Sequence, residues 1–90
     1  MIRIMTDARP KFITITVDGE LSSEYISAVE TCISQAMAKG RPVRLFLRDV
    51  SCIDESGRAL LGAVAAKGVR LRASGVYSSY VVAKISQSAA

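Results

Sequence analysis

The chain has 90 residues, of which half are hydrophobic and 22% are charged, and its formal net charge is +4 at neutral pH. This composition is typical of a folded globular protein and excludes an intrinsically disordered one. The sequence contains no histidine, which is the commonest metal ligand and the commonest general base near neutral pH. We therefore expect neither a zinc site nor histidine-based catalysis.

The cysteines and the apolar segments point to no special class of protein. Cys32 and Cys52 are too far apart in sequence for a metal-binding or redox pair, and we expect small apolar side chains, buried or half-buried, at both positions. The longest apolar stretch, residues 59–66, is far shorter than the roughly 20 residues of a membrane span. Residues 1–6 lack the long apolar centre of a secretory signal. We expect one cytoplasmic domain over residues 1–90, with no cofactor, metal or membrane partner.

The N-terminal part predicts a β-hairpin. Residues 1–6 form the first expected strand, and residues 7–10 supply turn chemistry with an aspartate and a proline. Residues 11–17 alternate strictly, as a second strand would. Their two faces carry Ile13, Ile15 and Val17 on one side and Phe12, Thr14 and Thr16 on the other.

A helix is predicted next. Ser22 or Ser23 can serve as its N-cap, and Glu24 would then lie in the first turn, where the helix dipole favours an acid. Gly40 ends the helix. One apolar stripe at helical spacing consists of Ile26, Val29, Ile33 and Met37.

The central segment carries the strongest chemical pattern. Residues 43–47 predict a buried strand, and a polar turn follows it. Asp54 stands where an N-cap belongs, ahead of a helix that ends at Gly68. Ser56 then falls in the first helical turn, beside the positive end of the helix dipole. A hydroxyl at that position is well placed to carry or to meet a negative charge.

The remaining chain completes an α/β fold. Residues 69–73 predict a fourth strand, residues 77–85 a short last helix and residues 86–90 a frayed tail. The element order is β-β-α-β-α-β-α. Helices connect the last three strands, so these should run parallel. We expect a small four-stranded, mostly parallel mixed sheet with the helices packed on one face.

The other face of this sheet should be at least partly open. It would carry Thr14, Thr16, Arg44, Phe46, Arg48, Arg70 and Arg72. Such a face could bind single-stranded nucleic acid through its cations and its ring. However, the ribonucleoprotein strand motif is missing, and arginine stems commonly cover apolar surface. We therefore expect a solvated face and no nucleic-acid partner; contact with a second copy, giving a homodimer, stays open.

Four segments mark the ends and starts of the predicted elements: Gly19-Glu20-Leu21, Asp49-Val50, Asp54-Glu55-Ser56-Gly57 and Lys67-Gly68-Val69-Arg70-Leu71. These segments and the element order together resemble the STAS domain, which has a SpoIIAA-like fold and is shared by sulfate transporters and anti-sigma-factor antagonists. The resemblance covers most of the chain, from the second strand onward.

The resemblance implies a regulatory role. Family antagonists carry aspartate, two serines and glycine at the helix start, and Ser56 occupies the place of the second serine, the phosphate acceptor. The unphosphorylated family member binds an anti-sigma factor, and phosphorylation by that partner, itself a serine kinase, breaks the complex. Here Glu55 replaces the first serine, Arg58-Ala59 replaces leucine–glycine, and Ser22 stands where the family often has an aspartate.

We therefore predict a protein-binding regulatory module of the anti-sigma-factor antagonist type, with Ser56 as its candidate phosphorylation site and switch. A phosphate adds about −1.5 to −2 charges, which would change the character of a contact surface. Glu55 also allows an alternative, a constitutive STAS scaffold in a signalling complex, because a fixed acid already gives the turn negative charge. The predicted contact surface consists of Glu20, Leu21, Ser22, Ser23, Asp54, Glu55, Ser56, Gly57 and Arg58.

Two carboxylates near the motif, Asp49 and Asp54, raise the question of acid–base catalysis. Glycosidase-like chemistry needs two carboxylates across a cleft, one of them with a raised pKa. Here one acid ends a strand and the other caps a helix, and no complementary group accompanies them. We expect no enzyme activity.

Overall fold

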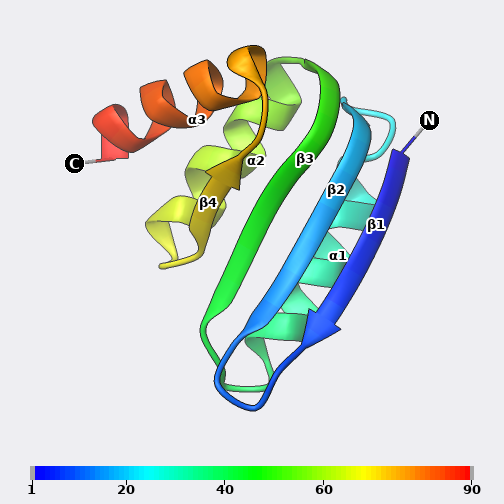
Figure 1. Cartoon of the computed structure of the whole chain (residues 1–90), viewed down its shortest axis with the longest axis vertical. Coiled ribbons are helices and arrows are strands. Elements are labelled where there is room, and N and C mark those ends of the chain that lie inside the picture. The colour runs from blue at the N-terminus through cyan, green and yellow to red at the C-terminus, as the bar shows by residue number, and fades with distance from the viewer. Residues whose placement is uncertain (1, 90) are drawn as a thin grey trace.

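In the computed structural model, which describes residues 2–89, one four-stranded sheet carries three helices (Figure 1). The strands lie in the order β1-β2-β3-β4. The elements are β1 (Ile2–Ala8), β2 (Ile13–Leu21), α1 (Ile26–Met37), β3 (Val43–Ile53), α2 (Glu55–Ala66), β4 (Arg70–Ala73) and α3 (Val76–Ala89). The predicted order of elements is confirmed.

The sheet is mixed, as predicted. β1 pairs antiparallel with β2, whereas β2, β3 and β4 run parallel. In Figure 1, α1 and α2 lie behind the sheet, and α3 lies beside α2 at the upper left. The carboxyl ends of the three parallel strands consequently meet at one edge, the upper edge in Figure 1, and α2 begins there.

The core lies between the sheet and the helices. Alternate residues of the two central strands face the helices and are buried: Ile13, Ile15, Val17, Leu45 and Leu47. The helices contribute Val29, Ile33, Leu61 and Val64 to the same cluster. The alternation in β2 therefore separates a buried face from an open face, as side chains on successive strand residues point to opposite sides of the sheet. Cys32 packs half-buried against the core, as expected, whereas Cys52 is exposed, contrary to the prediction.

Both central strands are longer than the sequence predicts. β3 continues to Ile53, over the residues where we expected a polar turn. Two irregularities in its pairing with β2 explain the discrepancy, because Arg48 and then Ser51 have no partner in the parallel register. Each extra residue breaks the alternation of polar and apolar positions. Gly19, at the second irregularity, has φ 107°, which favours glycine.

Two of the predicted helices have wrong boundaries. α1 begins at Ile26 after the N-cap residue Tyr25, and no side chain caps it. Neither Ser22 nor Ser23 is therefore the cap, and Glu24 lies in the preceding turn. α3 begins at Val76 and continues past residue 85. The frayed tail expected over residues 86–90 stays a prediction, because residue 90 and the side chains of 86–89 lie outside the described part of the chain.

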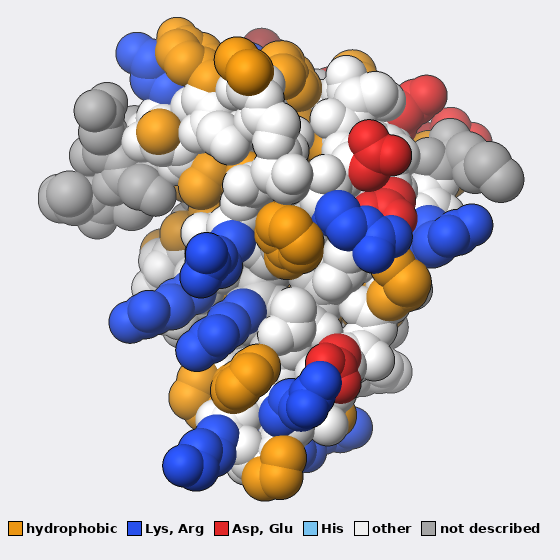
Figure 2. All heavy atoms as spheres, in the orientation of Figure 1, with side chains coloured by type: hydrophobic (Ala, Val, Ile, Leu, Met, Phe, Trp, Pro, Cys, Tyr) orange, Lys and Arg blue, Asp and Glu red, His pale blue; other side chains and the backbone are white. Residues whose placement is uncertain are grey.

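No helix of the described residues covers the second face of the sheet, as expected (Figure 1). Figure 2 shows Lys and Arg side chains spread over this face, with hydrophobic side chains between them. Arg44 and Arg70 are direct partners in the β3–β4 register, and Arg72 lies opposite Phe46. The Arg44 guanidinium also lies over the Phe12 ring, 4.2 Å from its centroid. Like charges therefore face each other across neighbouring strands.

Candidate functional site

Asp54 holds the start of α2 in place. It is the N-cap residue, with extended backbone angles, and its Oδ1 accepts a hydrogen bond from the Gly57 backbone N–H at 2.8 Å. Its Oδ2 accepts a second bond, from the Ser23 backbone N–H at 2.9 Å. These two bonds hold the pKa of Asp54 below its ordinary value, and the bond from Gly57 has the larger effect. The predicted N-cap role of Asp54 is confirmed, and the same carboxylate also binds the loop after β2.

The same carboxylate joins two segments that are 31 residues apart in sequence. Ser23 follows the end of β2, and the Asp54 backbone N–H donates to the Leu21 carbonyl oxygen at 3.2 Å. Leu21 also pairs with Ile53 at the ends of β2 and β3. The loop after β2 and the turn before α2 are therefore neighbours, as the parallel arrangement predicted.

Gly57 fits a space that allows no side chain. A Cβ atom on this residue would stand 2.4 Å from the Leu21 carbonyl oxygen and 3.0 Å from Cγ2 of Ile53. Atoms this close clash, so α2 can approach the end of β2 only with glycine here. The glycine of the central motif thus has a packing role in this chain.

Ser56 lies on the surface at the second position of α2 and is exposed. Glu55 before it and Arg58 after it are exposed as well, as are Glu20 and Ser23 on the neighbouring loop. This group places two hydroxyls, those of Ser56 and Ser23, among two acids and one base within a single patch. The Ser56 hydroxyl is accessible to a macromolecular partner, which is what the predicted role requires.

Leu21 and Gly57 do not belong to the contact surface that we predicted. Leu21 is fully buried, and Gly57 is buried against it. Their burial follows from the close approach of α2 to β2, and they shape the patch from below. The exposed residues that remain are Glu20, Ser23, Glu55, Ser56 and Arg58, with Ser22 and Asp54 half-buried. We name these seven residues the Ser56 patch.

Sequence reasoning missed the contribution of α3. The Tyr77 hydroxyl donates to the Ile53 carbonyl oxygen at 3.2 Å and accepts from the Ile53 N–H at 3.1 Å. The Ser78 hydroxyl, which is buried, donates to the Val50 carbonyl oxygen at 3.3 Å. These bonds fix α3 to the last residues of β3, directly before the Ser56 patch. Neither residue stands out in the sequence, because their partners are backbone atoms.

An ion pair stabilises the first bulge beside this edge of the sheet. Arg48 donates from its guanidinium to both carboxylate oxygens of Asp18, with Nε 3.1 Å from Oδ1. The hydrogen bond to Asp18 raises the Arg48 pKa above its ordinary value. Arg48 has no register partner of its own, so this side-chain contact ties the extra residue to β2.

Comparisons with known proteins address the fold. No protein-family model matches the sequence, and no curated protein matches it. The structure is similar to the crystal structure of an anti-sigma factor antagonist from Mycobacterium paratuberculosis, with a TM-score of 0.80 and 18% identity over 98% of this chain and 82% of that one. It is also similar to an uncharacterized protein with a SpoIIAA-like fold from Shewanella loihica, with a TM-score of 0.60 and 13% identity over 96% of this chain and 77% of that one.

Proposed function

We propose that this domain, whose fold is that of STAS domains, is a protein-binding regulatory module of the anti-sigma-factor antagonist type. Its partner would be an anti-sigma factor, which in that family is itself a serine kinase, and its place of action would be the cytoplasm. The proposal includes no catalytic step by this chain. The observation that carries it is the exposed Ser56 on a helix start that Asp54 ties to the loop after β2.

A rigid patch suits recognition because little order is lost on binding. Both carboxylate oxygens of Asp54 hold backbone N–H groups, one on each of the two segments that form the Ser56 patch. The segments therefore keep one relative position in the free domain. A partner that covers this patch meets a preformed surface.

Phosphorylation of Ser56 would act as a switch through charge. It adds about −1.5 to −2 charges beside Glu55 and Asp54, with Arg58 as the nearest cation in the helix sequence. A partner that buries the patch would then have to desolvate this charge without a matched counter-charge. Such burial is strongly unfavourable, so the complex should dissociate.

The test is affinity capture from native cytoplasm with the wild-type domain, Ser56→Ala and Ser56→Asp. We expect wild type and Ser56→Ala to retain one specific partner and Ser56→Asp to lose it. Ser34→Asp is the matched control, because Ser34 is also exposed but lies on α1. Mass spectrometry of the captured wild-type domain would identify phosphate on Ser56. Retention of the partner by Ser56→Asp would contradict the switch.

Glu55 supports a second candidate, a constitutive scaffold in a signalling complex. Its exposed carboxylate gives the turn a permanent negative charge directly before Ser56. On this model the same partner binds all Ser56 variants, whereas Glu55→Lys reduces capture. The pair Ser56→Asp and Glu55→Lys therefore separates the two candidates.

A nucleic-acid role receives less support from the open face. The Arg44 guanidinium covers the Phe12 ring just before β2, which leaves Phe46 of β3 as the aromatic ring on the strands of that face in the described chain. Stacking of successive bases needs several accessible rings. A salt-dependent RNA-binding assay tests this role directly, since phosphate contacts weaken steeply as salt rises.

A further inference from the structure

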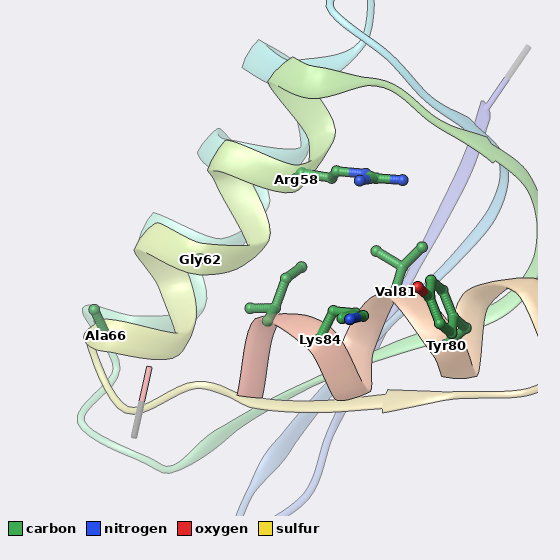
Figure 3. A pocket seen from close by; sticks show the side chains of 7 residues that line it. Arg58, Gly62, Ala66, Tyr80, Val81 and Lys84 are labelled. Carbon is green, nitrogen blue, oxygen red and sulfur yellow. The ribbon is translucent and has the colours of Figure 1, made fainter. Parts of the chain in front are cut away.

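A groove runs between α2 and α3, next to the Ser56 patch (Figure 3). It has a volume of about 440 Å³. Its lining includes Arg58, Gly62 and Ala66 from α2 and Tyr80, Val81 and Lys84 from α3. Figure 3 shows Arg58 extending from α2 above the groove, with Val81 and Lys84 on the α3 side. We propose that this groove binds an acidic amphipathic helix of the partner protein that contacts Ser56.

Gly62 leaves the groove open at a position where no packing contact within the described domain requires a glycine. A Cβ atom on Gly62 would have no neighbour within 4 Å, so no packing contact requires glycine there. Glycine is also less favourable than alanine inside a helix. The groove therefore reaches down to the α2 backbone, which allows another backbone to approach closely.

The charges of the lining select an anionic occupant. Arg58 and Lys84 both line the groove, and no acidic side chain does so among the described residues. The Lys84 amino group lies 5.6 Å from the centroid of the Tyr80 ring, so the aromatic ring and this cation border the groove together. Carboxylates on an occupant would meet the complementary charge of Arg58 on α2.

The shape of the groove favours a helix over a small molecule. The lining on α2 runs from Arg58 to Ala66, a rise of about 12 Å at 1.5 Å per residue. Small-molecule sites enclose most of their ligand, whereas here Tyr80 is 59% exposed at the groove. Val81 is 2% exposed and closes the base of the groove, while the exposed Tyr80 and the half-buried Ile85 supply its apolar surface. An amphipathic helix places apolar side chains in such a groove and charged ones along its rims.

This inference rests on the proposed function, because it names the partner element that binds beside the Ser56 patch. Arg58 belongs to both surfaces, two residues after Ser56 on the same helix. A partner that covers the patch therefore reaches the groove without leaving α2. The two contacts would form one continuous interface.

The first test is an NMR titration of the ¹⁵N-labelled full chain with synthetic 18-residue peptides. One peptide is an amphipathic helix with leucines on one face and glutamates beside them, and its control has lysines in place of the glutamates. We expect the glutamate peptide alone to shift the amide signals of residues 58–66 and 80–85. Equal shifts with both peptides, shifts confined to the open sheet face, or no shifts at millimolar peptide would overturn the proposal.

The second test uses variants in the same titration. Gly62→Leu fills open space in the groove, and Lys84→Glu reverses one charge. We expect each to weaken binding of the glutamate peptide by about tenfold, the ratio that corresponds to 1.4 kcal/mol. Ala63→Leu is the control, because Ala63 is exposed on α2 and does not line the groove; it should keep the affinity within about twofold. Unchanged affinity in both groove variants would contradict the assignment.

Capture of the native partner separates this inference from the proposed switch. If the groove assignment alone fails, Gly62→Leu retains the partner that Ser56→Asp loses. If the switch alone fails, Ser56→Asp retains the partner that Gly62→Leu loses. Each proposal can therefore be rejected while the other stands.

Discussion

The backbone of Leu21 and the α-carbon of Gly57 are packed together without space for a side chain between them. The Leu21 carbonyl oxygen lies 2.4 Å from the point where a Cβ atom on residue 57 would stand. This contact brings the start of α2 against the end of β2. The position of the Ser56 patch in this fold therefore depends on a residue that the patch does not expose.

Gly57→Ala should destabilise the domain. The new methyl group must displace the Leu21 backbone or the start of α2, and overpacking of this kind typically costs about 1–3 kcal/mol. In a domain of this size each kcal/mol lowers the melting temperature by roughly 4–8 °C. Thermal and urea unfolding would measure the loss. An unchanged midpoint would mean that the contact relaxes freely.

Gly62→Ala should have the opposite effect, although it lies on the same helix. Its Cβ would meet nothing within 4 Å, so only helix propensity changes. Replacing glycine by alanine inside a helix stabilises by about 0.5–1 kcal/mol. The same unfolding measurements should give a higher midpoint than for wild type. A lower midpoint would contradict the open geometry of the groove.

Acid should weaken the domain partly through Asp54. Its pKa is lowered in the folded state, so its ionised form contributes stability above the ordinary aspartate value, and that contribution disappears as the pH falls through the folded pKa. Asp54→Asn removes the charge and one acceptor. We expect the variant to be less stable at neutral pH, with a smaller loss of stability than wild type below about pH 4. Urea unfolding between pH 2 and pH 7 measures how the free energy of unfolding changes with pH for wild type and for the variant. The same pH dependence in both would exclude this contribution of Asp54.

Arg70→Gln should stabilise the sheet. Arg44 and Arg70 are direct register partners on β3 and β4, and like charges in that position are unfavourable. Removing one of them should raise stability by about 0.2–1 kcal/mol at low salt. Added salt screens the repulsion, so the difference in the free energy of unfolding between variant and wild type should become smaller. Lys67→Gln, on an exposed residue after α2, is a charge-matched control.

The sequence predicts the fold well where a periodic pattern is unbroken. The alternation of residues 13–17 and the N-cap at Asp54 are both present in the structure. The prediction fails where geometry depends on distant segments. The extra residues Arg48 and Ser51 interrupt the period of β3, so a strand resembles a turn.

In the candidate site, too, local features could be predicted from the sequence, whereas contacts between distant segments could not. Ser56 is exposed at the start of α2, as its position after a capping residue predicts. The backbone bond from Ser23 to Asp54 and the role of Tyr77 could not be predicted, since both join parts of the chain that only the folded sheet brings together. Ser22 and Ser23 are predicted as N-caps because serine is a preferred residue at that position, and residue type is the only information that the sequence holds there.

The bond between Asp54 and Gly57 determines where an added phosphate could go. A helix start normally offers its free backbone amides to an anion, but here a carboxylate already occupies the amide of Gly57. A phosphate on Ser56 could take the Gly57 amide only by displacing Asp54, whose other carboxylate oxygen holds Ser23. A phosphate that turned outward instead would leave the shape of the domain unchanged, and a docking protein, rather than the fold, would then respond to the modification.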